Sequence, residues 1–350
     1  MAKKLDNYRL LGRSGLRVSP LALGTMTFAA AGFGGTDNDA AAMVDLYVDR
    51  GGNFIDTANF YGGMGGAERL LGKLIAGRRD RLVISTKYSL STCPGDPNAA
   101  GNHRKNMVRS VEDSLARMRT DYIDLLYLHM WDFRTPVDEI LRAFDDLVRQ
   151  GKILYAGLSD TPAWQAARMQ AIAEQRGWTQ FAALQISYSL IERTVEHELM
   201  PMAREMGMGV CPWSPLAGGV LSGKYTKADL ALATGTMDRK AINVMTGRIT
   251  ERTLAIADVV QSVAREMGRT PAQVALAWTM LHPAVTAPVL GARTPAQLED
   301  NLAALEIDLS PDHIVCLNEA SALAPIFPMS VLRSASEPVM FGRVKVEERD

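Results

Sequence analysis

The chain has 350 residues, of which 47% are hydrophobic and 22% charged, and its formal net charge at pH 7 is −1. This is the composition of an ordinary globular protein, and the near-zero charge gives no reason to expect a nucleic-acid partner. Residues Met1–Asp6 lack an apolar signal region, and no run of about 18 apolar residues predicts a membrane span. The three cysteines, Cys93, Cys211 and Cys316, are far apart, which favours thiols in a reducing compartment over a disulfide framework. We therefore expect a soluble cytoplasmic protein.

The predicted elements begin with a hairpin and then alternate between strands and helices. Tyr8–Leu11 and Leu16–Val18 are short alternating runs about a glycine-containing turn, which is a hairpin signal. The runs that predict strands are Leu21–Gly24, Asn53–Ile55, Leu82–Thr86, Ile123–Leu128, Ile153–Leu158, Phe181–Ile186, Gly209–Trp213 and Val285–Leu290. The stretches that predict helices are Asp37–Asp49, one beginning at Gly66, Lys105–Arg119, Pro136–Gln150, Pro162–Gln175, His197–Met206, Arg252–Met267, Pro271–Leu281 and Pro295–Leu305.

This alternation predicts an α/β fold, a (β/α)8 TIM barrel with an amino-terminal β-hairpin. Eight strand–helix units in about 250 residues match a closed barrel, whereas a doubly wound sheet needs a reversal of strand order that sequence alone cannot show. No linker divides the chain, so residues 1–323 are expected to form a single domain. The tail, residues 324–350, contains Ser334–Pro338 and a charged end, Glu347–Asp350, and is expected to be loosely ordered.

Four groups that can transfer or orient protons lie at equivalent places in these units. Asp56 ends the second strand, Tyr61 lies just beyond it, Lys87 ends the third strand and His129 ends the fourth. Each alone has a structural explanation, because a strand-end lysine is commonly a solvated rim charge and a histidine there is commonly hydrogen-bonded structure. In a barrel, however, these strand ends face one mouth, where the chemistry of such folds is found. Four such residues on three successive strands favour a catalytic site.

Proton transfer is the chemistry that these groups permit. A free phenol has a pKa of about 10, and a neighbouring ammonium favours the phenolate and lowers that pKa. Asp56 is expected to keep Lys87 charged and oriented, and His129 is expected to donate a hydrogen bond to a substrate oxygen. Together they form a general acid for an oxygen that becomes negative during a reaction.

From about Tyr8 to Leu323 the sequence resembles the aldo-keto reductases. The motifs that carry the resemblance are Leu23–Met26, Asp56–Ala58 with Tyr61–Gly62, Thr86–Lys87, Leu128–His129, Gly157–Asp160, Leu184–Gln185, Trp213–Leu216 and Gly291–Arg293. The resemblance implies hydride transfer from a nicotinamide to the carbonyl of an aldehyde or ketone. It implies Tyr61 as the general acid, and Asp56, Lys87 and His129 complete a catalytic group that we call the tetrad.

The resemblance also implies a binding site for NADPH or NADP+ on the barrel itself, and the Rossmann fingerprint G-x-G-x-x-G is missing. Ser159, Asp160 and Gln185 are expected at the carboxamide, although many relatives have Asn at the position of Asp160. An ionised Asp only accepts hydrogen bonds, whereas Asn also donates. Trp213 is expected to stack on the nicotinamide ring. The complete expected set is Gly24, Thr25, Met26, Asp56, Ser159, Asp160, Gln185, Trp213, Ser214, Pro215, Leu216, Ala217, Gly219, Lys224, Gly291, Arg293, Gln297, Asp300 and Asn301.

The stretch Gly291–Leu298 supports the adenosine end of this site independently of the resemblance. It is a strand-to-helix turn, and a helix amino terminus suits an anion. Arg293 lies in this turn, and Gln297 and Asn301 follow it at spacings of one helical face. A cation there predicts a preference for NADPH over NADH, since the two cofactors differ only by the 2′-phosphate.

The alternative functions are an NTPase, a metal-dependent hydrolase and a non-catalytic binding protein. Gly218–Tyr225 nearly spells a P-loop, but Tyr225 replaces the hydroxyl residue that binds magnesium. The five histidines are dispersed without a metal-binding motif, so no metal site is predicted. The third alternative is a non-catalytic NADPH-binding partner or redox-sensing subunit, and the complete tetrad favours an enzyme.

The substrate pocket is expected at Thr27–Thr36, Tyr88–Asn102 and Met130–Trp131, near Tyr61 and His129. The aromatic residues of these segments, Phe28, Phe33, Tyr88 and Trp131, suggest an apolar pocket for an aromatic or alicyclic carbonyl. The same side chains equally fit simple packing of the loops. The predicted partner is therefore a small carbonyl compound, with no nucleic acid and no membrane.

Overall fold

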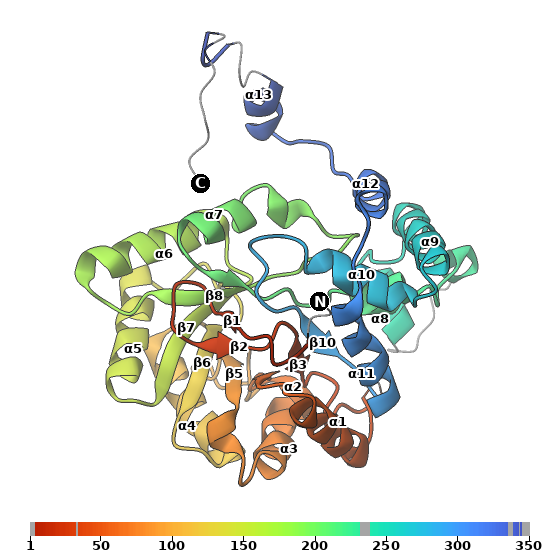
Figure 1. Cartoon of the computed structure of the whole chain (residues 1–350). Coiled ribbons are helices and arrows are strands. Elements are labelled where there is room, and N and C mark those ends of the chain that lie inside the picture. Colours follow the sequence, from red (N-terminus) through yellow and green to blue (C-terminus); the bar gives the residue numbers. More distant parts are fainter. Residues whose placement is uncertain (1–3, 33, 232–238, 335–338, 343, 345–350) are drawn as a thin grey trace.

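Eight parallel strands form a curled, TIM-like barrel in the part of the chain that the structure describes, as the strand–helix units predict (Figure 1). The computed structural model describes residues 4–32, 34–231, 239–334, 339–342 and 344. The barrel strands are β3 (Ala22–Gly24), β4 (Phe54–Asp56), β5 (Val83–Tyr88), β6 (Ile123–Leu128), β7 (Ile153–Ser159), β8 (Phe181–Gln185), β9 (Gly209–Val210) and β10 (Val289–Gly291). The sheet has the order β10, β3, β4, β5, β6, β7, β8, β9, and every neighbouring pair is parallel.

The barrel closes between β9 and β10 through a short seam. Val210 forms an isolated parallel bridge with Val285, and the amide of Val289 donates a hydrogen bond of 2.8 Å to the carbonyl of Pro212. The strands predicted at residues 209–213 and 285–290 are shorter in the structure than expected. Each contains a proline, Pro212 or Pro288, and a proline has no amide N–H to extend the ladder.

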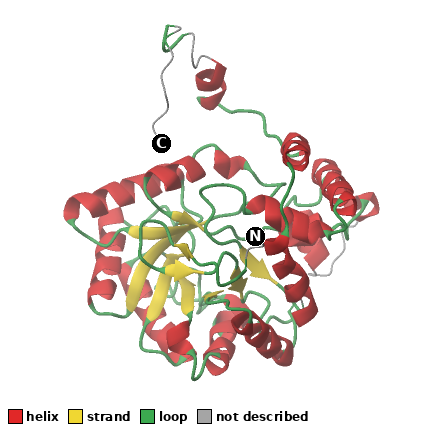
Figure 2. Ribbon diagram, viewed as in Figure 1, coloured by secondary structure: helices red, strands yellow, loops and turns green. Residues whose placement is uncertain are grey.

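Helices surround the sheet as an outer layer (Figures 1 and 2). The helix α5 shows why: Val137, Ile140, Leu141, Phe144 and Leu147 recur every three or four residues and are all buried against the strands. The helices are α1 (Asp37–Asp49), α2 (Tyr61–Met64), α3 (Gly66–Leu74), α4 (Arg104–Met118), α5 (Val137–Arg149), α6 (Ala163–Arg176), α7 (Leu199–Glu205), α8 (Arg239–Met245), α9 (Glu251–Glu266), α10 (Pro271–Thr279), α11 (Pro295–Leu302), α12 (Pro311–Ala320) and α13 (Met329–Ser334).

Four of these helices were not expected from the sequence, and the first is α2, the short helix that begins at Tyr61. The helix α8 lies in the long connection after β9, and α12 follows the last barrel helix. The helix α13 lies in the tail that was expected to be loosely ordered, and Figure 1 shows the tail leaving the barrel beyond α12. Val331 and Leu332 on α13 are 54% and 44% exposed, so its hydrophobic residues lack the periodic burial that marks a core helix. The predicted tail segments at residues 335–338 and 347–350 lie outside the described residues.

The predicted hairpin is confirmed and closes the amino-terminal end of the barrel. The strands β1 (Arg9–Leu10) and β2 (Arg17–Val18) pair antiparallel. Leu11, which follows β1, and Val18 of β2 are fully buried among side chains of the barrel strands. Gly12 has a φ of +57°, and a Cβ there would lie 2.5 Å from the carbonyl oxygen of Ala182. The tight approach of this turn to the barrel therefore requires glycine.

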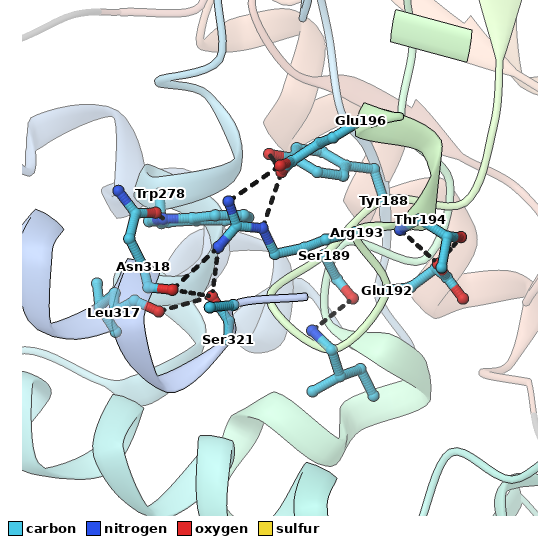
Figure 3. Close-up of polar contacts among 12 residues, drawn as sticks. Tyr188, Ser189, Glu192, Arg193, Thr194, Glu196, Trp278, Leu317, Asn318 and Ser321 are labelled. Atoms are coloured by element: carbon cyan, nitrogen blue, oxygen red, sulfur yellow. Dashed lines mark hydrogen bonds and ion pairs between the residues drawn. The ribbon is translucent and has the colours of Figure 1, made fainter. Parts of the chain in front are cut away.

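A polar cluster fastens α10 and α12 to the segment after β8 (Figure 3). The guanidinium of Arg193 donates to the carboxylate of Glu196 through Nε at 2.9 Å and Nη2 at 3.0 Å. Its Nη1 donates to the carbonyl of Asn318 at 3.2 Å and to the hydroxyl of Ser321 at 2.8 Å. The guanidinium also lies over the ring of Trp278, 5.1 Å from its centroid. All three nitrogens of Arg193 therefore have protein partners, and we call these five residues the Arg193 cluster.

The structure describes two features that the composition raised, the membrane-spanning potential of the helices and the state of the cysteines. None of the helices in the described ranges has the length and apolar character needed to cross a membrane. Cys93, Cys211 and Cys316 are all free, with Cys211 buried and the other two exposed.

Candidate active site

A cavity of about 580 Å³ opens at the carboxyl ends of the barrel strands. Its wall combines these strand ends with the segment after β9 and the start of α11. The predicted site residues that line it are Gly24, Met26, Asp56, Tyr61, His129, Ser159, Asp160, Gln185, Trp213, Ser214, Pro215, Leu216, Gly219, Lys224, Gly291, Arg293, Gln297, Asp300 and Asn301. The fold thus brings together residues that are up to 277 positions apart, from Gly24 to Asn301. This is the end of a TIM barrel at which active sites occur.

A buried ion pair lies at the inner end of this cavity. The ammonium Nζ of Lys87 donates to Asp56 Oδ2 at 2.5 Å and to the carbonyl of Thr57 at 2.8 Å. The other carboxylate oxygen of Asp56 accepts from the hydroxyl of Ser85 at 2.7 Å and from Nε2 of Gln185 at 2.9 Å. Asp56 and Lys87 are only 2% and 1% exposed. A buried pair needs such additional hydrogen bonds, and here they fix the position of the ammonium.

Tyr61 is the first residue of α2 and lies beside this pair. Nζ of Lys87 is 5.0 Å from the centroid of its ring. Burial lowers the pKa of Lys87, but the charges of Asp56 and Tyr61 and their hydrogen bonds to the ammonium together more than offset it, so the net shift is upward and the ammonium persists. Burial raises the pKa of Tyr61, while the charge of Lys87 opposes that rise. The sequence predicts a lowered pKa for Tyr61, and the charge of Lys87 does act in that direction. Desolvation outweighs this effect, so the net shift is upward and the phenol is protonated near neutral pH.

His129 follows β6 and completes the tetrad. Its ring meets that of Tyr61 edge to face, with the centroids 5.8 Å apart and an angle of 84° between the planes. Burial and the charge of Lys87 lower the pKa of His129 to about 3. The ring is therefore neutral at physiological pH, with one donor nitrogen and one acceptor nitrogen. Its Nδ1 is buried without a hydrogen-bond partner in the described chain.

Two of the residues expected at the carboxamide, Gln185 and Asp160, already form hydrogen bonds with other side chains. Nε2 of Gln185 donates a hydrogen bond to Asp56. The other polar atom of the Gln185 side chain is its amide oxygen. Oδ1 of Asp160 accepts from the indole N–H of Trp213 at 3.0 Å. Asp160 also has a φ of +36°, which is a strained value for a residue other than glycine. The contact between Asp160 and Trp213 is a feature that the sequence did not reveal.

The part of the expected cofactor site between Ser214 and Lys224 has an unusual backbone. Ser214 and Ala217 have φ values of +52° and +50°, and two glycines follow at positive φ within the 3₁₀ helix Ala217–Ser222. A Cβ on Gly219 would lie 2.7 Å from Nζ of Lys224, so the ammonium lies directly over this backbone. Strained residues of this kind gather at ligand sites. Ala217 itself is buried and is not part of the cavity wall, unlike Ser214 and Gly219.

The expected adenosine end is the turn between β10 and α11. Thr294 caps α11, its hydroxyl accepting from the amide of Gln297 at 3.3 Å. The side-chain oxygen of Gln297 accepts from the amide of Arg293 at 3.0 Å. Arg293 is exposed at the cavity and forms no ion pair with the described residues. Asp300 is already engaged, since its carboxylate accepts from Nε2 of Gln273 at 2.8 Å.

The cavity fits a nicotinamide dinucleotide by its chemistry and its volume. It combines polar groups near the tetrad, among them the carboxylate of Asp160, with the cations Lys224 and Arg293 toward the other end. Gly291 lines the cavity, and a Cβ at this position would meet no atom within 4 Å, so any side chain would occupy the cavity itself. The volume lies within the range of about 300–1,000 Å³ that ligand pockets have.

Some predicted residues lie outside the cavity wall. Thr25 is fully buried and its hydroxyl has no partner among the described residues. Phe28 is 1% exposed and packs in the hydrophobic core, so it does not form the expected substrate wall. Trp131 is 6% exposed, and its ring meets Phe133 edge to face at 6.5 Å. Phe33 lies outside the described residues.

The substrate-pocket prediction for Tyr88 needs correction. Tyr88 is fully buried, its hydroxyl donates to the carbonyl of Asn102 at 3.1 Å, and its ring meets Phe144 of α5 at 6.0 Å. Successive side chains of a strand face opposite sides, so Tyr88 points to the helix layer because Lys87 points into the barrel.

Sequence reasoning missed Phe60, which lines the cavity together with Asp56, Tyr61 and His129, and it did not single out Leu90 within the expected segment Tyr88–Asn102. Phe60 directly precedes Tyr61 in the chain, and this adjacency is the sequence signal that could have placed Phe60 in the site. Ser85 was missed as well, although it lies two residues before Lys87 and strand alternation places both on the inner face. Its hydrogen bond to Asp56 makes it part of the support of the ion pair.

The alternative sites find no support. The P-loop-like stretch contains the 3₁₀ helix Ala217–Ser222 and does not open an α-helix as a P-loop does. Within the described residues, no group of three or more His, Cys, Asp or Glu side chains could hold a metal ion.

Sequence comparison agrees with the geometry. The pattern of the Aldo/keto reductase family matches residues 20–322. The uncharacterized oxidoreductase YrpG of Bacillus subtilis (strain 168) is 40% identical over 326 residues, covering 89% of this chain and 95% of YrpG. The norsolorinic acid reductase stcV of Emericella nidulans is 38% identical over 330 residues, with 91% and 82% covered. The aryl-alcohol dehydrogenase (NADP(+)) of Phanerodontia chrysosporium is 33% identical over 351 residues, with 95% and 91% covered. This chain is therefore an oxidoreductase of the aldo-keto reductase family.

Proposed function

We propose that this protein reduces an aldehyde or ketone to the alcohol with NADPH, and that Tyr61 is the general acid. The observation that carries the proposal is the position of Tyr61, which lines the cavity between Lys87 and His129. Its pKa is above the ordinary value because of burial, so the phenol holds the proton that the reaction requires.

The proton passes from Tyr61 to the carbonyl oxygen of the substrate. Lys87 stabilises the phenolate that remains, and Asp56 keeps the ammonium charged and fixed. General acid catalysis of this kind typically contributes about 10²–10⁴-fold. NADPH, when bound, supplies the hydride that the carbonyl carbon receives.

His129 orients the carbonyl through a hydrogen bond. Because burial holds its pKa at about 3, the ring acts as a neutral donor and does not compete with Tyr61 as an acid. A preorganised donor aimed at an oxygen that becomes negative stabilises the transition state. The edge-to-face contact with Tyr61 places both donors at the same part of the cavity.

We infer a preference for NADPH over NADH from Arg293. The guanidinium is exposed at the cavity, has no ion-pair partner in the described chain and lies beside the capped start of α11. A guanidinium and a helix amino terminus together favour a phosphate. The name of the Phanerodontia chrysosporium relative, which specifies NADP(+), points the same way.

We propose an aromatic or alicyclic carbonyl as the substrate. Met26, Phe60 and Leu90 give the cavity apolar walls near the tetrad. The Phanerodontia chrysosporium relative is named an aryl-alcohol dehydrogenase, which points the same way.

The test is NADPH oxidation with a panel of aryl and alicyclic aldehydes and ketones, using cofactor that carries deuterium at nicotinamide C4. We expect steady oxidation and one deuterium on the carbinol carbon of the product. NADPH binding without oxidation of any panel member would contradict the proposal and favour a non-catalytic NADPH-binding subunit.

A further inference from the structure

The proposed mechanism leaves one half-buried carboxylate at the catalytic end of the cavity without a role. Asp160 follows β7 and lines the cavity, and its Oδ1 accepts the indole N–H of Trp213 at 3.0 Å. No salt bridge reaches Asp160 in the described part of the chain. Burial raises its pKa, while the Trp213 hydrogen bond and the charge of Lys87 oppose that rise.

The other groups of this region cancel one another in charge. Asp56 and Lys87 form a 2.5 Å ion pair. Tyr61 is protonated, and His129 is neutral because its pKa is about 3. Arg248 lies over the ring of Trp213, with Cζ 5.7 Å from its centroid, and it is not part of the cavity wall. Asp160 is therefore the uncompensated charge on the wall at the tetrad end.

The reacting ring must lie close to this charge. The inference rests on the proposed function, in which a carbonyl oxygen takes its proton from Tyr61 while its carbon receives a hydride. The nicotinamide therefore has to reach the part of the cavity that Tyr61, His129 and Trp213 bound, and Asp160 lies on the same wall.

We propose that the Asp160 carboxylate stabilises the oxidised nicotinamide relative to the reduced one and so makes bound NADPH a stronger hydride donor. When the C4–H bond breaks, the hydrogen and its electron pair pass to the carbonyl carbon, and the proton of Tyr61 passes to the oxygen. The nicotinamide ring changes from neutral to positively charged in this step. A nearby negative charge favours the product ring, and in a site shielded from water this attraction is stronger than in bulk solvent.

The Asp160→Asn variant isolates the charge. It keeps the size of the side chain and an oxygen that can accept from Trp213, and it removes the negative charge. The dissociation constants of NADP+ and NADPH are measured by calorimetric titration at a pH of about 8. We expect the ratio of the NADP+ constant to the NADPH constant to rise about tenfold, which equals about 1.4 kcal/mol, or about 30 mV for a two-electron couple.

Asp113→Asn is the matched control. Asp113 is an exposed carboxylate on α4, and its change alters the net charge equally but should leave the ratio as it is. Asp160→Ser provides the same loss of charge if the Asn variant does not fold. A ratio within twofold of the original in a folded Asp160 variant that binds both cofactors overturns the inference. Failure of the unmodified protein to bind either cofactor overturns the proposed function instead.

Discussion

The Arg193 cluster and the tetrad are both polar, largely enclosed and built around an ion pair. They differ in how many of their polar atoms have hydrogen-bond partners. In the Arg193 cluster all three guanidinium nitrogens bond to protein atoms, and Trp278 covers the guanidinium (Figure 3). In the tetrad the inner pair is satisfied, but His129 is not. Tyr61 and His129 line a cavity, and Nδ1 of His129 has no partner within the described chain.

On the proposed function, the difference separates a structural polar cluster from a catalytic one. A saturated cluster lowers the free energy of the folded state and has no remaining groups for a ligand. An unsaturated one retains the desolvation cost of its unpaired groups, which a substrate can relieve. The pKa shifts agree, since burial raises the pKa of the Tyr61 phenol and lowers that of the His129 imidazole to about 3.

The largest expected effect is that of Tyr61→Phe. The change removes only the phenol oxygen and its proton, so kcat should fall by about 10²–10⁴-fold while NADPH binding stays close to normal. Steady-state kinetics and a binding titration on the same preparation provide the measurement. A variant that retains the original kcat would show that Tyr61 is not the acid.

Lys87→Met should reduce kcat nearly as strongly, and Asp56→Asn less. Lys87 opposes the burial that raises the pKa of Tyr61, whereas Asp56 acts through Lys87. Without Lys87 the pKa of Tyr61 rises further, so the alkaline limb of the kcat profile should move to higher pH. An unchanged profile in a partly active Lys87 variant would exclude this coupling. Because Lys87→Met leaves Asp56 buried and unpaired, the free energy of unfolding should also fall.

Arg293→Ala should have a smaller and more selective effect. Charge-assisted hydrogen bonds contribute about 1.5–3 kcal/mol, so NADPH should bind roughly tenfold or more weakly, with NADH nearly unaffected. Fluorescence titration with both cofactors measures this. Equal losses for the two would mean that Arg293 does not recognise the 2′-phosphate.

Arg193→Ala should have the smallest effect on catalysis and act on stability instead. It removes four hydrogen bonds and the contact with Trp278, and the Arg193 and Glu196 side chains are only 16% and 25% exposed. The free energy of unfolding should fall by roughly 1–3 kcal/mol, because partial exposure to solvent limits the loss. Denaturant unfolding measures the change, and Arg81→Ala, at an exposed arginine without an ion pair among the described residues, is the control.

The fold, and the grouping of the four tetrad residues at one end of the barrel, were predictable because both depend on local pattern. Alternating apolar runs define the strands, and Asp56, Lys87 and His129 follow directly from where three of those strands end. The contact between Asp160 and Trp213 joins residues 53 positions apart, and no periodicity encodes it. The net pKa shift of Tyr61 depends on how deeply the folded chain buries the phenol, which a list of neighbouring charges does not contain.

The measurement that tests the contrast most directly is kcat per folded molecule, determined side by side for Tyr61→Phe and Arg193→Ala together with their unfolding free energies. We expect a crossed result: Tyr61→Phe loses kcat and keeps its stability, whereas Arg193→Ala loses stability and keeps its kcat. Loss of the same quantity in both variants would contradict the division between a catalytic cluster and a structural one.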